Sequence, residues 1–470
     1  MASIPNPSIH LSKSPKPTFT SLQRAPPLTI CTLKSPNSDQ KLVIHGGSKL
    51  SGHVEISGSK NSALAVLAGT LCCSGASKLH NVPDISDVRT MVSILRTLGA
   101  RVEMCGGEVV VESDGVRSVE PCCDELRKMR AGFFVLGPLI ARFGEAVVAL
   151  PGGCDIGSRP VDLFVNGLRA LGAVVELRQR KVEAVTANGK GLVGGRFHLD
   201  YPSVGATETL MMAASLADGV TVLSNVAKEP EVVDLARFLN NSGASVEGAG
   251  SGTLVINGRK RLLVPEFIVI PDRIEAGTLM VAASITGSCF SMSPVVPSHL
   301  SSVIDKLSAA GCKFKHTSFG NLEIAAIPSM LGGNFQGFDV TTGPFPTFPT
   351  DLQPQMMALL TICKGSSIVK ESVFEGRMNH VRELQKLGAR IKVCGSTALV
   401  YGKQKGRSLR GSHVVASDLR TGASLVLAGL AAEGITEIDG LSHIDRGYEN
   451  LEFKLQSLGA DIRRRSITSS

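Results

Sequence analysis

The stretch that decides the fold is Leu98-Gly99-Ala100, because the same pattern returns along the whole chain. It joins the apolar end of a helix, a glycine, a small residue and the start of a strand. Glycine suits this place because it adopts the left-handed backbone conformation without the steric penalty of other residues. The glycines lie 68 to 77 residues apart, so the 470-residue chain holds six copies of one unit. The copies are Leu98-Gly99-Ala100, Leu171-Gly172-Ala173, Ser242-Gly243-Ala244, Ala310-Gly311-Cys312, Leu387-Gly388-Ala389 and Leu458-Gly459-Ala460.

Two kinds of helix precede this glycine. The nearer helix is amphipathic, as in 231–240, where Pro230 fits the first turn. The other is apolar on nearly every side, as in 62–70 and 422–430, so we expect it to be buried. One unit is therefore predicted as strand, buried helix, strand, surface helix, strand, strand. Three units make about 210 residues, the size of one domain, so we predict two similar α/β domains of three βαβαββ units each.

The composition excludes several classes of protein. Hydrophobic residues make up 43% of the chain, which allows a sizeable core and argues against global disorder. Aromatic residues make up only 4% and tryptophan is absent, so base-stacking platforms are not expected. The net charge of +8 is dispersed, without the basic stripe of a duplex-binding face. No apolar run reaches the roughly 18–20 residues that span a bilayer. The eleven cysteines follow no disulfide or zinc spacing, which indicates free thiols in a reducing compartment.

The amino-terminal segment differs from the rest of the chain. Through Asn37 it is rich in Ser, Thr and Pro, and Asp39 is its first acidic residue. Such composition is typical of an organelle transit peptide, and scarce Arg with plentiful Ser and Pro favours the chloroplast. The alternative is a disordered tail. We predict a disordered transit peptide over 1–40, cleaved between roughly residues 35 and 45, and a location in the chloroplast stroma.

The second copy carries a loop that the other five copies lack. This segment, LPGGCDIGSRPVDL at 150–163, holds Cys154 five residues before Arg159. A thiol near positive charge can have a lowered pKa and act as an acid or a nucleophile. The alternative is a structural cysteine, but the unique loop and the nearby Arg favour a catalytic role.

Two further candidates lie at helix starts. Lys60 and Asn61 precede the first buried helix, where backbone N–H groups and the helix dipole suit an anion. Asp351 precedes the fifth buried helix, where an Asp is ordinarily an N-cap. It becomes a candidate base only if a substrate hydroxyl can reach it.

The sixth copy carries two arginines at similar junctions. Arg420 precedes its buried helix, and Arg446 follows further along the copy. A buried Arg is costly without an anion or an acidic partner, so both are candidates for an anion site. The alternative is a pair of internal salt bridges, to Asp418 or Asp445.

Seven runs of the sequence together resemble one known family. That family is the UDP-N-acetylglucosamine 1-carboxyvinyltransferases, a branch of the enolpyruvyl transferases, here in a plant plastid form. The match runs in uninterrupted order from about residue 42 to residue 464. The runs that carry it are SGSKNSALAVLAG, LPGGCDIGSRPVDL, PSVGATET, PDRIEAGT, FPTD, SDLRTGASLVLAG and HIDRGYE.

The resemblance implies a fold and a set of partners. The family fold has two domains of three repeated units with the helices inside, an inside-out α/β barrel, in agreement with the repeat count. The implied domains are 60–271, carrying the cysteine loop, and 41–59 plus 272–466. Ligands bind between the domains, and closure excludes water and aligns the reactants. The implied partners are two small molecules, with no cofactor, metal, nucleic acid or membrane, and a monomer is expected.

The resemblance also implies the reaction. The enolpyruvyl group of phosphoenolpyruvate would pass to the 3-hydroxyl of UDP-N-acetylglucosamine by addition–elimination, with release of phosphate. This is the first committed step of peptidoglycan precursor synthesis.

The family's functional residues are carried over only where the motifs match. Cys154 matches the catalytic cysteine, which acts as general acid and can form a covalent adduct with phosphoenolpyruvate, and Asp351 matches the base for the sugar hydroxyl. Phosphoenolpyruvate carries several negative charges, so a cationic cage is required. The cage positions are Lys60, Arg159, Arg420 and Arg446, of which Lys60 and Arg420 also count as catalytic. Positions matching contacts to the nucleotide sugar or the closed site are Asn61, Arg130, Arg159, Pro160, Val161, Asp162, Leu163, Ser203, Val204, Gly205 and Val373.

The chain departs from the family pattern at two places. Tyr201 and Pro202 stand where some members have a Lys that contacts the nucleotide, which puts that contact in doubt. Phe133 and Phe134 stand where some members have a Trp. The catalytic cysteine is retained, so we predict sensitivity to fosfomycin.

Three rival functions are weighed against this one. The sister enzyme of the same fold acts on shikimate 3-phosphate, but the Cys154 loop with its RPVDL continuation belongs to the nucleotide-sugar branch. A catalytically silent descendant that only binds UDP-sugar or a protein is disfavoured because the cage and catalytic residues are all present. A thiol hydrolase lacks an obvious His base near the loop.

Overall fold

The computed structural model describes residues 40–152, 161–189, 191–263, 266–317, 320–327, 335–403 and 408–466. These residues form one compact unit with two separate hydrophobic cores. The first core gathers buried side chains from residues 63 to 269, and we call this part the first lobe. The second gathers them from 42 to 56 and from 274 to 462, and we call this part the second lobe.

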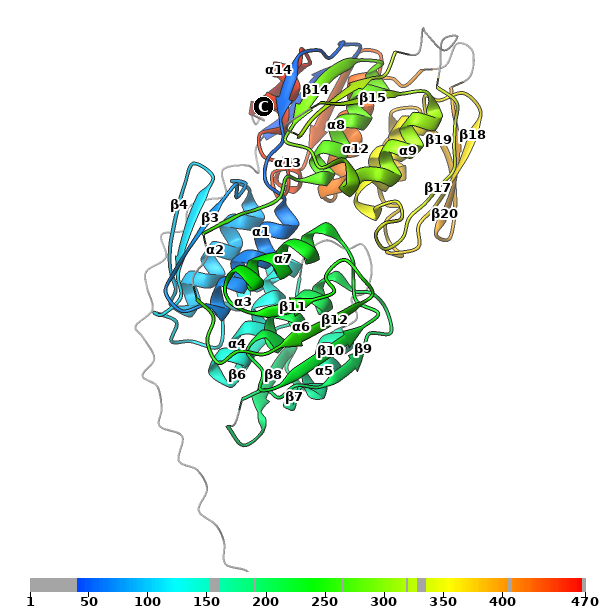
Figure 1. Cartoon of the computed structure of the whole chain (residues 1–470). Coiled ribbons are helices and arrows are strands. Elements are labelled where there is room, and N and C mark those ends of the chain that lie inside the picture. The colour runs from blue at the N-terminus through cyan, green and yellow to red at the C-terminus, as the bar shows by residue number, and fades with distance from the viewer. Residues whose placement is uncertain are drawn as a thin grey trace, which may run out of the picture. The chain divides into compact units, whose positions relative to one another are not determined.

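Six sheets match the six predicted units, five with four strands and one with three among the described residues (Figure 1). In a typical sheet, β9 (Arg196–His198) runs parallel to β10 (Val220–Ser224). Strand β10 is antiparallel to β12 (Thr253–Asn257), which is antiparallel to β11 (Ser245–Glu247). The predicted α/β fold of two three-unit halves is therefore confirmed.

The first lobe contains the following elements. Its helices are α1 (Lys60–Gly69), α2 (Ser86–Leu98), α3 (Cys123–Lys128), α4 (Leu136–Phe143), α5 (Val161–Ala170), α6 (Val204–Ser215) and α7 (Pro230–Asn241). Its other strands are β3 (Ala76–His80), β4 (Arg101–Cys105), β5 (Glu108–Glu112), β6 (Glu145–Ala149), β7 (Ala173–Arg178), β8 (Lys181–Thr186) and β13 (Glu266–Ile268).

The second lobe repeats this plan. Its helices are α8 (Arg273–Thr286), α9 (Ser301–Ala310), α10 (Gln353–Leu360), α11 (His380–Lys386), α12 (Leu419–Ala431), α13 (Leu441–Ile444) and α14 (Leu451–Ser457). Its strands are β1 (Gln40–His45), β2 (His53–Glu55), β14 (Cys289–Ser293), β15 (Lys313–Thr317), β16 (Asn321–Ala325), β17 (Val340–Thr341), β18 (Ser366–Lys370), β19 (Arg390–Cys394), β20 (Thr397–Tyr401), β21 (His413–Val415), β22 (Ile435–Asp439) and β23 (Asp461–Ser466).

All six signature glycines adopt the predicted left-handed conformation, with φ between +83° and +114°. Gly99 shows why no larger residue fits: a Cβ there would lie 2.7 Å from the carbonyl oxygen of Gly115. The glycine ends α2 and turns the chain directly into β4. The repeat is thus fixed by backbone geometry as well as by hydrophobic pattern.

The helices predicted to be buried form the centre of each lobe. Every residue of α8 and α10 is buried, as are residues 62–69 of α1 and 206–215 of α6. In the second lobe α8, α10 and α12 pack against one another, and α8 and α12 lie side by side in Figure 1. Their small residues allow this close packing, and the sheets cover the outside. Within the described ranges, none of the helices has the length and apolar character needed to cross a membrane.

The chain passes between the lobes twice, and the two passages run together. The N–H of Ser59 donates to the carbonyl of Ile270 at 2.7 Å, and that of Asp272 donates to the carbonyl of Ser57 at 2.9 Å. The two cores begin and end close to these passages, which supports the predicted boundaries at 60 and 272; the boundaries stay a prediction. Strand β1 begins at Gln40, the last residue of the predicted disordered leader, because Gln40 pairs with Ser466.

Candidate active site

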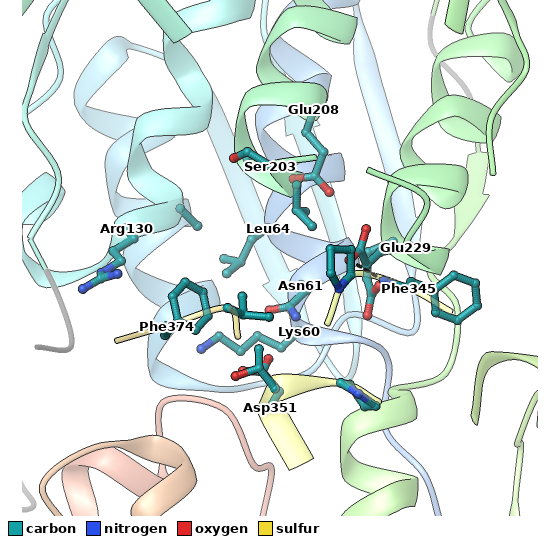
Figure 2. A pocket seen from close by; sticks show the side chains of 18 of the residues that line it. Lys60, Asn61, Leu64, Arg130, Ser203, Glu208, Glu229, Phe345, Asp351 and Phe374 are labelled. Atoms are coloured by element: carbon teal, nitrogen blue, oxygen red, sulfur yellow. Dashed lines mark hydrogen bonds between the residues drawn. The ribbon is translucent and has the colours of Figure 1, made fainter. Parts of the chain in front are cut away.

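A cavity of about 520 Å³ is lined by residues of both lobes, next to the paired passages. Its volume is within the usual range of about 300–1,000 Å³ for small-molecule sites. Figure 2 shows the labelled side chains of Lys60, Asn61 and Asp351 turned into this space. Lys60 and Asn61 lie on α1, and Asp351 lies just before α10. The fold therefore brings together positions almost 300 residues apart in the sequence.

Lys60 begins α1, which Ser59 caps by accepting a hydrogen bond from the N–H of Ser62. The Lys60 ammonium lies 2.6 Å from Oδ2 of Asp87, and Nε of Arg446 lies 2.9 Å from Oδ1 of the same carboxylate. Asp87 is only 4% exposed. Its burial alone would raise its pKa, but Lys60 and Arg446 together hold that pKa below the ordinary value.

Asp87 therefore joins two predicted cage cations, Lys60 of the first lobe and Arg446 of the second. The cluster of two cations and one carboxylate keeps a net positive charge that suits an anion. Asp87 was not among the residues predicted from the sequence, because an Asp in the first turn of α2 is an ordinary helix feature. No local signal shows that its partners come from both lobes.

Asp351 is the centre of a second cluster. It lies in the short 3₁₀ turn Thr350–Leu352 rather than in the N-cap position of α10. Its Oδ1 lies 3.0 Å from Nη1 of Arg377, and its Oδ2 lies 3.1 Å from Nη2 of Arg420. Burial alone would raise the pKa of Asp351, but the two guanidiniums hold it far below the ordinary value.

The alternative of a salt bridge inside the sixth copy is wrong for Arg420. Asp418 is the N-cap of α12 and accepts hydrogen bonds from the backbone N–H groups of Arg420 and Thr421. The Arg420 guanidinium instead reaches Asp351, from another copy. Asp445 pairs with Arg464 at 2.8 Å. These acids were assigned by nearness in sequence, whereas the charges pair across the packed helices.

The cavity continues along the start of α6. Ser203 caps this helix by accepting a hydrogen bond from the N–H of Ala206, and Ser203, Val204 and Gly205 at the helix start line the cavity. A Cβ on Gly205 would lie 3.2 Å from Phe164 and 3.3 Å from Phe134, so the two rings close in on this turn. Such a helix start suits a phosphate group.

Acidic side chains line another part of the cavity. Glu208 is 1% exposed and neither of its carboxyl oxygens has a partner within the described part of the chain. Burial, and then the nearby Glu231 and Glu229, raise the pKa of Glu208 well above its ordinary value. Glu231 forms a two-point ion pair with Arg273 at 2.9 and 3.2 Å. These acidic residues were not predicted from the sequence, because no motif marks them.

Most predicted site residues lie in this one cavity. Two do not line it: Asp162 is exposed on α5, and Leu163 is buried in the core of the first lobe. Cys154, Arg159 and Pro160 lie outside the described residues, so their roles stay predictions. Among the described side chains, no group of three or more His, Cys, Asp or Glu could hold a metal ion. The predicted residues that line the cavity are Lys60, Asn61, Arg130, Val161, Ser203, Val204, Gly205, Asp351, Val373, Arg420 and Arg446.

Known proteins resemble the chain over nearly its whole length. The family model for EPSP synthase (3-phosphoshikimate 1-carboxyvinyltransferase) matches residues 44–455. The UDP-N-acetylglucosamine 1-carboxyvinyltransferase of Gloeobacter violaceus is 51% identical, over 91% of each chain. The protein of the same name from Synechocystis is 46% identical, over 93% of this chain and 98% of its own.

Solved structures have the same fold. The enolpyruvyl transferase NikO from Streptomyces tendae superposes with a TM-score of 0.80 at 27% identity, over 91% of this chain and 99% of its own. EPSP synthase from Acinetobacter baumannii reaches a TM-score of 0.70 at 18% identity, over 91% of this chain and all of its own, which speaks for the fold alone.

Proposed function

Because the chain belongs to the enolpyruvyl transferase family, we propose that it transfers the enolpyruvyl group of phosphoenolpyruvate to the 3-hydroxyl of UDP-N-acetylglucosamine. The observation that carries this proposal is a single cavity lined by two cationic clusters, Lys60 and Arg446 around Asp87, and Arg377 and Arg420 around Asp351. The product would be the first committed precursor of peptidoglycan. Relatives named for this activity are 46–51% identical to the chain, whereas the EPSP synthase structure is 18% identical. Shikimate 3-phosphate is therefore the less supported candidate for the acceptor.

The reaction needs both clusters. The sugar oxygen bonds to C2 of phosphoenolpyruvate and loses its proton to a base, while C3 gains a proton. The tetrahedral intermediate then loses a proton from C3 and expels phosphate, which restores the double bond. The cations around Asp87 would hold the phosphate, and those around Asp351 would hold the carboxylate beside the sugar hydroxyl.

Asp351 is a weak base as long as both guanidiniums hold it. An anionic substrate that draws Arg420 or Arg377 toward itself would weaken these ion pairs and raise the pKa of Asp351. Base strength would then rise only when phosphoenolpyruvate is bound. In the free enzyme the low pKa keeps Asp351 ionised, so the base is not blocked by a proton before the substrates bind.

Cys154 would supply the proton to C3, by resemblance and by its place in the unique loop. The same thiol is the site where we expect fosfomycin to react. These two expectations share one residue, so a single substitution tests both.

The amino-terminal segment directs the protein to the chloroplast in this proposal. Its support is the composition of residues 1–40, rich in Ser, Thr and Pro and without an acidic residue before Asp39. Residues 1–40 fused to a fluorescent protein should carry it into chloroplasts of plant cells. A fusion that stays in the cytosol contradicts the proposed location.

The proposed reaction is tested by phosphate release from the full chain, given phosphoenolpyruvate with UDP-N-acetylglucosamine or with shikimate 3-phosphate. We expect release with the nucleotide sugar only, abolished by Cys154→Ala and by fosfomycin. The matched control is Cys394→Ala, which removes an exposed free thiol on β19 and should leave release unchanged. A folded protein that is inactive with both acceptors would favour a silent UDP-sugar-binding descendant.

A further inference from the structure

The segment 445–449 contacts both lobes within five residues. The backbone carbonyl of Asp445 accepts a hydrogen bond from the N–H of Ser86, which begins α2 of the first lobe. Arg446 pairs with Asp87 of the same helix. Tyr448, two residues later, points instead into the centre of the second lobe, where it is 3% exposed. The chain that brings Arg446 to the first lobe therefore also places this phenol.

The Tyr448 hydroxyl is the meeting point of three side chains. Nη1 of Arg420 lies 3.1 Å from it, Nε2 of Gln355 lies 3.1 Å from it, and Oγ1 of Thr278 lies 2.8 Å from it. The guanidinium carbon of Arg420 also lies 5.5 Å from the centre of the Tyr448 ring. The phenol thus holds Arg420 through its oxygen and through its ring face.

The direction of these hydrogen bonds is fixed by chemistry. Arg420 and Gln355 can only donate through these nitrogens, so the phenol oxygen accepts from both. Its own O–H must then donate to Thr278, whose hydroxyl donates to the carbonyl of Ile274 on α8 at 2.8 Å. Tyr448 is therefore anchored to α8 and offers its lone pairs to Arg420.

The opposite side of Arg420 faces the cavity. Its Nη2 donates to Oδ2 of Asp351, and Gln355 donates to the backbone carbonyl of Asp351 at 3.0 Å. Asp418, the nearest acid in sequence, is occupied in capping α12. The orientation of the guanidinium between α8 and the cavity therefore depends on Tyr448 and Asp351.

We propose that Tyr448 is a positioning residue, which holds the guanidinium of Arg420 in the orientation that serves Asp351 and the carboxylate of phosphoenolpyruvate. This inference rests on the proposed function. The Tyr448 hydroxyl would not touch either substrate. Its removal should nevertheless raise KM for phosphoenolpyruvate more than KM for the nucleotide sugar.

The test is Tyr448→Phe in the full chain, which keeps the ring and removes only the hydroxyl. We expect KM for phosphoenolpyruvate to rise about tenfold, the scale of one hydrogen bond to a charged group. KM for UDP-N-acetylglucosamine should change less than about twofold. The matched control is Tyr401→Phe, because the Tyr401 ring also lies against an arginine, Arg390 at 5.1 Å, but outside the cavity. It should change neither constant.

A double-mutant cycle with Arg420→Lys shows whether Tyr448 acts through Arg420. In the Arg420→Lys chain we expect Tyr448→Phe to change kcat/KM by less than about twofold, because the phenol no longer has a guanidinium to orient. A full additional loss in that background, an equal rise of both KM values, or no effect of Tyr448→Phe would each overturn the inference.

Failure of the proposed reaction is a separate result. If the unaltered chain releases no phosphate, the proposed function fails, and phosphoenolpyruvate is titrated into the same variants by calorimetry. Weaker binding to the Tyr448→Phe chain than to the Tyr401→Phe chain would still support the positioning role. Equal binding to both would contradict it.

Discussion

Two helices of the second lobe, α8 and α12, begin in the same way and use their arginines differently. Asp272 caps α8 and Asp418 caps α12, each accepting two backbone N–H groups through Oδ1. Each helix then presents a buried arginine within its first two residues, Arg273 on α8 and Arg420 on α12. Both arginines line the cavity.

Their partners make the difference. Arg273 meets both oxygens of Glu231, so its charge is neutralised by one carboxylate in the geometry that favours guanidinium most. Arg420 shares Asp351 with Arg377 and otherwise meets a neutral phenol, and within the described residues its Nε has no partner. The repeat thus supplies the same arginine twice, once as a closed structural pair and once with charge to spare for an anion.

The largest expected effect separates these two arginines. Arg420→Lys should lower kcat/KM about 10²–10³-fold with little change in thermal midpoint, because one fixed donor to the reacting anion is lost. Arg273→Lys should keep activity within about tenfold but lower the free energy of unfolding by about 1–3 kcal/mol. Phosphate release and thermal melts of both variants check this. Equal activity losses would mean that the two arginines serve the same role.

The second prediction concerns the carboxylate between Arg377 and Arg420. Asp351→Asn should lower kcat about 10²–10⁴-fold, the usual scale for a positioned base. The two guanidiniums lower the pKa of Asp351, so in the free enzyme it stays ionised throughout the working range. The ratio of wild-type to variant kcat/KM should therefore be constant between about pH 5 and 8. A ratio that falls toward low pH would show that the unloaded carboxylate takes up a proton in this range.

The third prediction extends the comparison to α1, where Asp87 joins Lys60 to Arg446. Asp87→Asn leaves two half-buried cations without their acid and should cost about 3 kcal/mol of unfolding free energy at neutral pH. The pKa of Asp87 is lowered in the folded state, so its stabilisation is present above the unfolded value of 3.8 and is lost as the pH falls below it.

The difference between wild type and Asp87→Asn should therefore shrink in thermal melts below about pH 4. The control is Asp84→Asn. Asp84 is an exposed acid just before α2, and it pairs with Arg89 of that helix. Its effect should stay below about 1 kcal/mol. A difference for Asp87→Asn that grows toward acid pH would contradict the ion-pair account.

The smallest expected effect concerns Glu208, the buried acid near Glu231 and Glu229. The pKa of Glu208 is raised in the folded state. Its contribution to the free energy of unfolding is therefore fully present below the unfolded pKa of 4.5 and is lost as the pH rises. Glu208→Gln has the same shape and never ionises. It should match the wild type near about pH 4.5 and be more stable by on the order of 1 kcal/mol at about pH 8. Lower stability at both pH values would show that the carboxyl makes a contact that the amide cannot replace.

Much of the scaffold could be predicted from the sequence because its signals are local. Gly99 and its five counterparts take positive φ as predicted, since helix ends are decided within a turn. The helices 62–70 and 422–430 were predicted as buried from their composition alone, and the structure places them in the lobe centres. Lys60, Asp351, Arg420 and Arg446 were found as candidates because they stand at junctions of the repeated units, next to helix starts or in the unit that follows.

Only the tertiary structure decided which charges meet. Asp87 reaches Arg446 across 359 residues of sequence, and Tyr448 reaches Thr278 across 170. Arg420 reaches Asp351 and Arg446 reaches Asp87, and neither acid is close to its arginine in the sequence. Backbone conformation depends on a residue and its neighbours within a few positions, whereas the pairing of buried charges depends on which helices pack together. The sequence alone therefore determined the repeat and its candidate residues, and the packing of the two lobes determined which of them form a site.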